Sequence, residues 1–194
     1  MQCVIYYYIG QLPVAPQSFL LLHHEQRRID CMEKNKARTY QNSRNWIKHL
    51  IIQNQWQVED FKYNTAGKPI MNTQNQYLSV THSAQLWAVA FSTVPIGIDC
   101  ESKTPKNLER FADYFQIKST HLPDIQKDWM LREAYAKLSG ASIMRLRKKS
   151  IQSLLDSENI QHRILNLEDY ILTLIGQTHH PIDVHTYTLR DILK

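Results

Sequence analysis

The order of its apolar segments constrains the fold of this chain more than any other feature of the sequence. A polar, glycine-free stretch at 18–53 has apolar residues at helical spacing near its end, and a second helical pattern covers 128–138. Short strands are predicted at 77–80, 86–91, 96–98, 164–167, 170–175 and 184–187. The order helices, strands, helix, strands predicts an α+β protein with two similar halves, residues 1–101 and 102–194.

Basic side chains outnumber acidic ones, 23 to 18, which gives a formal net charge of +5. Much of the excess lies in residues 1–50, and a second basic cluster spans Arg145–Lys149. This charge fits a polyanionic partner, which could be a nucleic acid, a phosphorylated cofactor or an acidic protein, and it equally fits a solvated basic surface. Charge alone does not choose among these alternatives.

Several classes of protein are disfavoured by the composition. No run of about 18 apolar residues occurs, so we expect no membrane span. The N-terminal segment alternates like a strand and lacks the basic start and cleavage site of a signal peptide. The three cysteines are scattered and form no C-x-x-C pair, and the histidine pairs at 23–24 and 179–180 lack other zinc ligands at a suitable spacing. We therefore expect a cytoplasmic protein with reduced thiols.

A pair of carboxylates lies on the predicted strand that ends near residue 101. Asp99 and Glu101 are two residues apart, so both point to the same side of the strand. Like charges held this close repel each other unless a cation or an opposite charge lies between them. Carboxylate oxygens are ligands that Mg²⁺ accepts, usually together with substrate phosphates. The pair therefore predicts a metal site, with a solvated strand end as the alternative.

A carboxylate and an amine lie on one face of the predicted helix. Glu133 and Lys137 are four residues apart, which is one helical turn. Alone, such a pair fits an ordinary surface ion pair worth about 0.3–0.5 kcal/mol. The other motifs of the chain favour a functional role for this pair.

Four short motifs follow one another within residues 67–137. They are Gly67-Lys-Pro69, Leu78-Ser-Val-Thr-His-Ser83, Pro95-Ile-Gly-Ile-Asp-Cys-Glu101 and Trp129-Met-Leu-Arg-Glu-Ala-Tyr-Ala-Lys137. This series resembles the 4′-phosphopantetheinyl transferases, particularly the two-lobed type that acts on carrier proteins of peptide and polyketide synthetases. The last two motifs carry most of the specificity of the resemblance.

The resemblance implies both a fold and an activity. The fold is a monomer of two pseudo-symmetric α/β lobes, each an antiparallel sheet with a packed helix, with coenzyme A in the cleft between them. The activity is the Mg²⁺-dependent transfer of phosphopantetheine from coenzyme A to a serine of an apo acyl, peptidyl or aryl carrier protein. Adenosine 3′,5′-bisphosphate leaves in the same step. The pathway could be fatty acid, siderophore, nonribosomal peptide or polyketide synthesis, and no nucleic acid or membrane partner is implied.

The resemblance assigns Asp99, Glu101 and Glu133 to the Mg²⁺ site. Glu133, directly or through a metal-bound water, would remove the proton of the carrier serine. Lys137 would bind the cofactor and stabilise or protonate the departing bisphosphate, so Glu133 and Lys137 are the expected catalytic residues. Positioning and charge neutralisation should dominate the catalysis.

The remaining cofactor contacts are expected from basic residues. The resemblance assigns Lys68 and His82 to the phosphates of coenzyme A, and Arg44 is the best match to a family arginine. Trp129 is expected to pack and so to fix the helix that carries Glu133, without a catalytic role.

The sequence departs from the family pattern at several positions. Thr81 replaces a serine and keeps the hydroxyl, Cys100 replaces an aliphatic residue, and the second glycine usual after Gly140 is missing. The segment between Glu101 and Trp129 is short for the two-lobed type. Its apolar residues are expected to be core, with a surface for the carrier helix as the alternative; they are Phe111, Tyr114, Phe115 and Ile117.

Two other functions stay open at this point. A non-catalytic relative could bind coenzyme A or a carrier protein without turnover, although all three acidic ligands and Lys137 are present. A basic nucleic-acid-binding protein is the other reading, but the sequence has no recognisable motif of that class.

Overall fold

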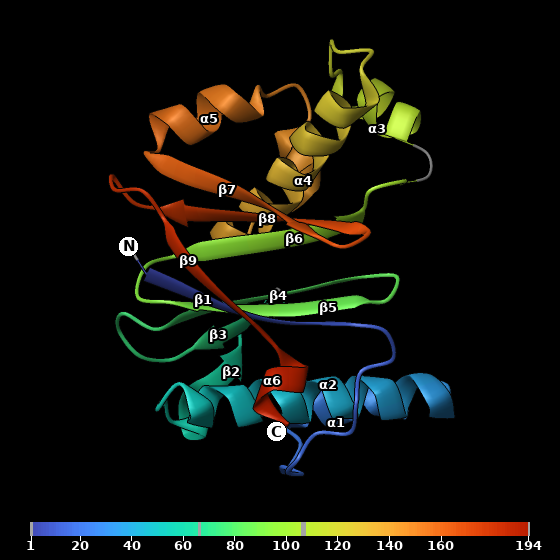
Figure 1. The fold of residues 1–194 in the computed structure, drawn as a ribbon, viewed down its shortest axis with the longest axis vertical. Helices are drawn as coiled ribbons and strands as arrows, with labels where there is room; N and C mark the ends of the chain where they lie inside the picture. Colours follow the sequence, from blue (N-terminus) through green and yellow to red (C-terminus); the bar gives the residue numbers. More distant parts are fainter. Residues whose placement is uncertain (1, 66, 106–107, 194) are drawn as a thin grey trace.

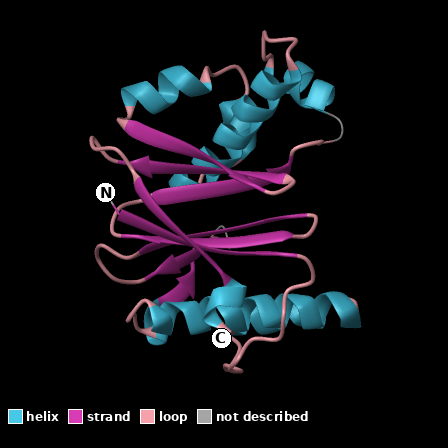
Figure 2. Ribbon diagram, viewed as in Figure 1, coloured by secondary structure: helices cyan, strands magenta, loops and turns pink. Residues whose placement is uncertain are grey.

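Two β-sheets lie face to face in the middle of the molecule, with helices on both outer sides (Figures 1 and 2). This arrangement is seen in a computed structural model that describes residues 2–65, 67–105 and 108–193. The strands are β1 (Gln2–Ile9), β2 (Phe61–Tyr63), β3 (Pro69–Met71), β4 (Tyr77–Ser83), β5 (Leu86–Ser92), β6 (Ile96–Ser102), β7 (Ile160–Leu167), β8 (Tyr170–Gln177) and β9 (Asp183–Thr188). The helices are α1 (His23–Asp30), α2 (Lys34–Gln53), α3 (Leu108–Phe115), α4 (Leu122–Ser139), α5 (Ile151–Ser157) and α6 (Leu189–Ile192), with 3-10 turns η1 (Val58–Asp60) and η2 (Ile143–Leu146).

The same topology occurs twice along the chain. In the first lobe, β1 leads to the long helix α2 and then to the hairpin β4–β5, and the sheet order is β4-β5-β1. In the second lobe, β6 leads to the long helix α4 and then to the hairpin β7–β8, with the corresponding order β7-β8-β6. All of these pairings are antiparallel. The α+β fold with two similar lobes is therefore confirmed.

The sheets do not divide at residue 101 as expected. β6 (Ile96–Ser102) lies almost wholly within 1–101 but pairs with β8. Its apolar side chains face the core between the sheets, and Gly97, Asp99 and Glu101 face α4. β9 lies within 102–194 but returns to the first sheet (Figure 1), where it pairs with β1. That pairing is parallel, so the first sheet is mixed and not purely antiparallel as predicted.

Strict alternation along the strands builds three layers of core. The layer between the sheets contains alternate residues of β1 and β5, such as Ile5 and Ala88, and faces Ile98 of β6. The other side of the first sheet packs on α2, whose buried face includes the predicted Trp46 and Leu50. The other side of the second sheet packs on α4 and α5. Each lobe thus has its own helix-covered core, and the middle layer joins the lobes.

The helices predicted within 18–53 are α1 and α2 in the structure, and the helix predicted at 128–138 is longer. α4 begins at Leu122, with Pro123 in its first turn, and it ends at Gly140, which has a left-handed φ of 71°. The basic run at 145–149 covers the end of η2 and the following turn, and of its residues Leu146 is buried. Within the described ranges, no helix is long and apolar enough to span a membrane.

Candidate active site

The site residues gather where three elements from both lobes meet. β4 is the edge strand of the first sheet and β6 the edge strand of the second, and they lie side by side (Figure 1). α4 crosses β6 so closely that a methyl group on Gly97 would lie 2.8 Å from the backbone nitrogen of Leu138 and 3.0 Å from the carbonyl carbon of Ala134. Glycine at this position therefore lets α4 bring its side chains down to β6.

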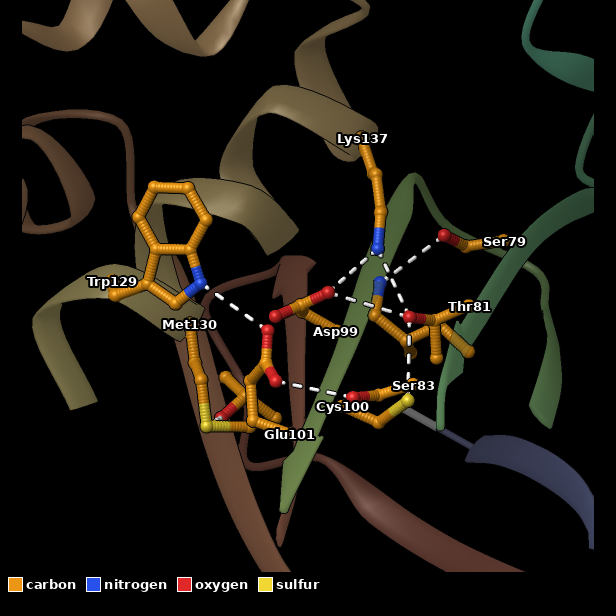
Figure 3. Close-up of polar contacts among 11 residues, drawn as sticks. Ser79, Thr81, Ser83, Asp99, Cys100, Glu101, Trp129, Met130 and Lys137 are labelled. Atoms are coloured by element: carbon orange, nitrogen blue, oxygen red, sulfur yellow. Dashed lines mark hydrogen bonds and ion pairs between the residues drawn. The ribbon is translucent and has the colours of Figure 1, made fainter. Parts of the chain in front are cut away.

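Asp99 is the most enclosed of the predicted ligands, with 5% of its surface exposed. Its Oδ1 accepts a hydrogen bond from Lys137 Nζ at 2.7 Å and from Thr81 Oγ1 at 3.3 Å (Figure 3). Within the described part of the chain, its buried Oδ2 has no hydrogen-bond partner. Burial raises the pKa of the Asp99 carboxyl, and the Lys137 ammonium opposes that rise.

Glu101 is half-buried and is held at both oxygens. Ser83 Oγ donates to its Oε2 at 3.1 Å, and Trp129 Nε1 lies 3.4 Å from its Oε1 (Figure 3). Trp129 is itself fixed by stacking on Phe111 at a centroid distance of 3.9 Å. Burial, followed by the charge of Asp99, raises the pKa of the Glu101 carboxyl.

Glu133 lies one helical turn before Lys137 on α4. It is half-buried, and burial raises the pKa of its carboxyl, with Asp99 and Glu101 adding to the rise and Lys137 lowering it. Asp99 raises the pKa of both Glu101 and Glu133, and Glu101 adds to the rise at Glu133, so three carboxylates balanced by one nearby ammonium form a site of excess negative charge. Such a site favours a cation, a bound proton, or both.

The fit of this cluster to Mg²⁺ is partial. In the described ranges, no three His, Cys, Asp or Glu side chains are grouped closely enough to hold a metal ion. The buried Asp99 Oδ2 nevertheless has no partner, and the mutual repulsion of hard carboxylate oxygens is what a bound cation relieves. The donor set therefore fits Mg²⁺ chemically, and the predicted metal site stays a prediction.

Lys68 comes from the first lobe and contacts the end of α4 in the second lobe. Its Nζ donates to the carbonyl oxygen of Leu138 at 3.2 Å, and burial lowers the pKa of its amine. Lys68 also lines a cleft of about 470 Å³ that is bounded by β3, the start of β4, the start of β6 and the end of α4. The cleft is lined by Leu138, the residue after Lys137, and its lining does not include Asp99, Glu101 or Glu133.

Arg44 belongs to a second polar cluster, which lies under α1. Its Nη1 donates to the Tyr63 hydroxyl at 3.2 Å, its guanidinium lies 4.7 Å from the centre of the Tyr40 ring, and Tyr63 stacks on His24. Three buried polar atoms of this cluster lack a hydrogen-bond partner among the described residues: Arg44 Nε, the Tyr40 hydroxyl oxygen and His24 Nε2. Because buried polar atoms are normally satisfied, this pattern points to a ligand or to bound water.

His82 is not brought into contact with the carboxylate cluster. It is exposed and follows Thr81 on β4, so its side chain points to the opposite face of the strand. Its assignment to a phosphate of coenzyme A remains a prediction.

Sequence reasoning missed the hydroxyls that hold the carboxylates. From the sequence, Thr81 is expected only to be an acceptable replacement for a serine of the family pattern, and Ser83 is assigned no role. The signal was present, because Ser79, Thr81 and Ser83 alternate along one strand and therefore share a face. Cys100, which replaces an aliphatic residue of the family pattern, lies in the core between the sheets, and burial raises the pKa of its thiol to about 12.

The aromatic segment before α4 is core at Phe115 and half-buried at Phe111, Tyr114 and Ile117. Phe115 is buried and lies next to Trp129, and Phe111 stacks on the same tryptophan. Tyr114 differs, because its hydroxyl reaches the sulfur of the exposed Met144. The alternative of an apolar surface for a carrier helix therefore has little support from Phe111 and Phe115.

Two characterised proteins of Bacillus subtilis are similar to the chain in sequence. The 4′-phosphopantetheinyl transferase Sfp of strain 168 is 26% identical over 153 residues, and the 4′-phosphopantetheinyl transferase ffp is 28% identical over 153 residues. Each match covers 71% of this chain and 63% of the relative, so the chain spans less than two thirds of the length of these relatives. No protein-family model matches the chain. The similarity to these relatives, the four ordered motifs and the two-lobed fold together support the resemblance to the 4′-phosphopantetheinyl transferase superfamily.

Proposed function

We propose that the chain transfers the 4′-phosphopantetheine group of coenzyme A to a serine of an apo carrier protein. One observation supports the proposal: the buried Asp99 is bound at Oδ1 by Lys137, its Oδ2 has no partner among the described residues, and Glu101 and Glu133 lie near enough for the charge of Asp99 to raise their pKa values. A negatively charged centre next to cationic side chains suits a reaction in which a metal-bound pyrophosphate is broken.

Coenzyme A would bind through its phosphates. Lys137 and Lys68 are the cations at the lobe interface, and Arg44 adds a guanidinium with an unpartnered Nε in the neighbouring cluster. Guanidinium groups bind phosphate with paired donors, whereas ammonium groups act as point charges. The positive charge of residues 1–50 fits a polyanionic ligand, and the lack of a recognisable nucleic-acid-binding motif favours the phosphorylated cofactor over a nucleic acid.

Asp99, Glu101 and Glu133 would hold the Mg²⁺ ion. When bound, Mg²⁺ neutralises charge on the pyrophosphate oxygens and makes the phosphorus more electrophilic. Asp99 Oδ2 is the oxygen that is free for this role, since Lys137 and Thr81 occupy Oδ1.

Glu133 is suited to accept the proton of the carrier serine. In the metal-free chain, burial, followed by Asp99 and Glu101, raises the pKa of the Glu133 carboxyl. A bound Mg²⁺ would lower that pKa, so the proton would pass to Glu133 directly or through a metal-bound water. The serine oxygen then forms a bond to the β-phosphorus of coenzyme A, and the bond from that phosphorus to the bridging oxygen breaks. The electron pair stays on the bridging oxygen, so adenosine 3′,5′-bisphosphate leaves, and Lys137 stabilises its charge.

Intact-mass spectrometry tests the proposal. Purified apo acyl, peptidyl and aryl carrier proteins are incubated with the chain, coenzyme A and Mg²⁺, and parallel samples contain EDTA. We expect one phosphopantetheine to be added to at least one carrier with Mg²⁺ and none with EDTA. Binding of coenzyme A in calorimetry without any transfer would favour a non-catalytic binding protein, and absence of both would refute the proposal.

A further inference from the structure

A row of hydroxyl groups joins the two lobes at the site. Ser79, Thr81 and Ser83 occupy one face of β4 and reach across to β6 (Figure 3). Ser79 Oγ accepts from the backbone N–H of Ile98 at 3.1 Å, Thr81 Oγ1 lies 3.3 Å from Asp99 Oδ1, and Ser83 Oγ lies 3.1 Å from Glu101 Oε2. Each carboxylate of the D-x-E pair thus receives its own hydroxyl from the other lobe.

Thr81 does more than donate to a carboxylate. Its Oγ1 also accepts a hydrogen bond from Lys137 Nζ at 3.0 Å, while the same ammonium donates to Asp99 Oδ1 at 2.7 Å. A hydroxyl can accept and donate at once, so it closes a triangle of three charged or polar groups. The three members come from β4, β6 and α4, and Thr81 is only 3% exposed. Water therefore does not readily take over its contacts.

The triangle makes the two oxygens of Asp99 unequal. Both donors, the ammonium and the hydroxyl, are directed at Oδ1, and Oδ2 is buried without a partner among the described residues. Two bonds at one oxygen fix the plane of the carboxylate, because rotation would break both. Oδ2 is thereby presented to whatever occupies the space in front of it.

We propose that Thr81 is a positioning residue, which acts with Lys137 to hold Asp99 by Oδ1 and so to present Oδ2 to a cation. The inference rests on the proposed function. The Thr81 hydroxyl thus contacts the Asp99 carboxylate and the Lys137 amine, whereas the hydroxyl of Ser79 accepts a hydrogen bond from the backbone N–H of Ile98.

Three variants of the full chain test this role. Thr81→Val keeps the shape and removes the hydroxyl, and Thr81→Ser keeps the hydroxyl and removes a methyl. The matched control is Thr173→Val on β8, which removes an equally buried hydroxyl directly across the ladder from Asp99, where the Thr173 hydroxyl contacts Met130 Sδ. Steady-state transfer gives kcat, the KM for coenzyme A and the half-saturating Mg²⁺ concentration, and circular dichroism gives the Tm of each protein.

We expect Thr81→Val to lower kcat by about ten- to hundredfold, the range that the loss of a hydrogen bond to a charged group supplies. The half-saturating Mg²⁺ concentration should rise by about tenfold, and the KM for coenzyme A should change by less than about threefold, because the hydroxyl acts on the cation site. Thr81→Ser should restore kcat to within about threefold of the original, and Thr173→Val should stay within about twofold.

Metal binding gives a readout that does not depend on turnover. Electron paramagnetic resonance of Mn²⁺ in the presence of coenzyme A should show weaker binding to Thr81→Val than to Thr81→Ser. Equal Mn²⁺ affinity and equal Mg²⁺ dependence in these two variants would overturn the positioning role, as would equal loss of kcat in both. If the unsubstituted chain transferred nothing, the proposed function would fail and this role with it; transfer by that chain and by Thr81→Val at the same rate would refute the positioning role alone.

Discussion

Replacing Gly97 with alanine tests how closely α4 must pack on β6 for the site to form. The added methyl group would lie 3.0 Å from the carbonyl carbon of Ala134, 2.8 Å from the backbone nitrogen of Leu138, and closer still to the carbonyl oxygen of Ala134. All three atoms are backbone, so no side chain can rotate away. Since nonbonded carbon atoms prefer separations of about 3.5–4.0 Å, the contact with the carbonyl carbon alone requires the helix to move by at least about 0.5–1 Å.

That displacement is large on the scale of the site. The Lys137 Nζ to Asp99 Oδ1 distance is 2.7 Å, and the same shift would take it to about 3.2–3.7 Å, beyond a good charged hydrogen bond. Glu133 moves with the same helix. A misplacement of this size in catalytic geometry can cost about a hundredfold in rate. Overpacking should also cost about 1–3 kcal/mol of stability, which corresponds to a fall in Tm of about 2–12 °C.

The assay compares Gly97→Ala with Ile98→Val. Ile98 is the next residue on β6 and is fully buried, but it faces the core between the sheets and not α4. Shortening this side chain to valine should lower the free energy of unfolding by about 0.5–1.5 kcal/mol without moving α4. We expect kcat for transfer to fall by about a hundredfold in Gly97→Ala and to stay within about threefold of the original in Ile98→Val. Gly97→Ala with the original kcat and Tm would refute the argument that glycine sets the approach of α4.

Three further outcomes follow from the same contacts. Glu133→Gln should lower kcat by about 10²–10⁴-fold, the range of general base catalysis, while calorimetry shows coenzyme A affinity within a few fold; an unimpaired kcat would remove Glu133 as the base. Lys48→Met should lower the free energy of unfolding, measured in urea, by about 3–5 kcal/mol, because Lys48 (1% exposed) pairs with the fully buried Glu25. A decrease below about 1 kcal/mol would contradict this expectation. The raised pKa of Glu133 means that the folded chain binds the proton more tightly than the unfolded chain, so the metal-free protein should lose stability as pH rises from 4.5 through the raised pKa. Glu133→Gln should remove that part of the slope, and identical Tm–pH curves in EDTA for both proteins would contradict the shift.

Local spacing predicted much of the site. Two-residue spacing on a strand put Asp99 and Glu101 on one side of β6, and four-residue spacing put Glu133 and Lys137 on one face of α4. Which residues share a face follows from the backbone geometry of each strand or helix, so it does not depend on what the element packs against.

Contacts between elements could not be predicted in this way. The alternation of apolar residues predicts which face of β6 lies in the core, but it does not predict that β8 is its partner strand. The parallel return of β9 to β1 and the buried pair of Glu25 with Lys48 join residues far apart in the chain, with no local periodicity to show them. The hydroxyl of Thr81 belongs to the same class, since its partners lie on two other elements.

The most direct test of the transfer mechanism is the stoichiometry of both products in one reaction. Chromatography measures the adenosine 3′,5′-bisphosphate released, and intact-mass spectrometry measures the phosphopantetheine gained by the carrier protein, with Mg²⁺ and with EDTA. We expect equal amounts of the two products at every time point with Mg²⁺ and neither product with EDTA. Release of the bisphosphate without modification of the carrier, or modification that proceeds unchanged in EDTA, would contradict a Mg²⁺-dependent transfer to the carrier serine.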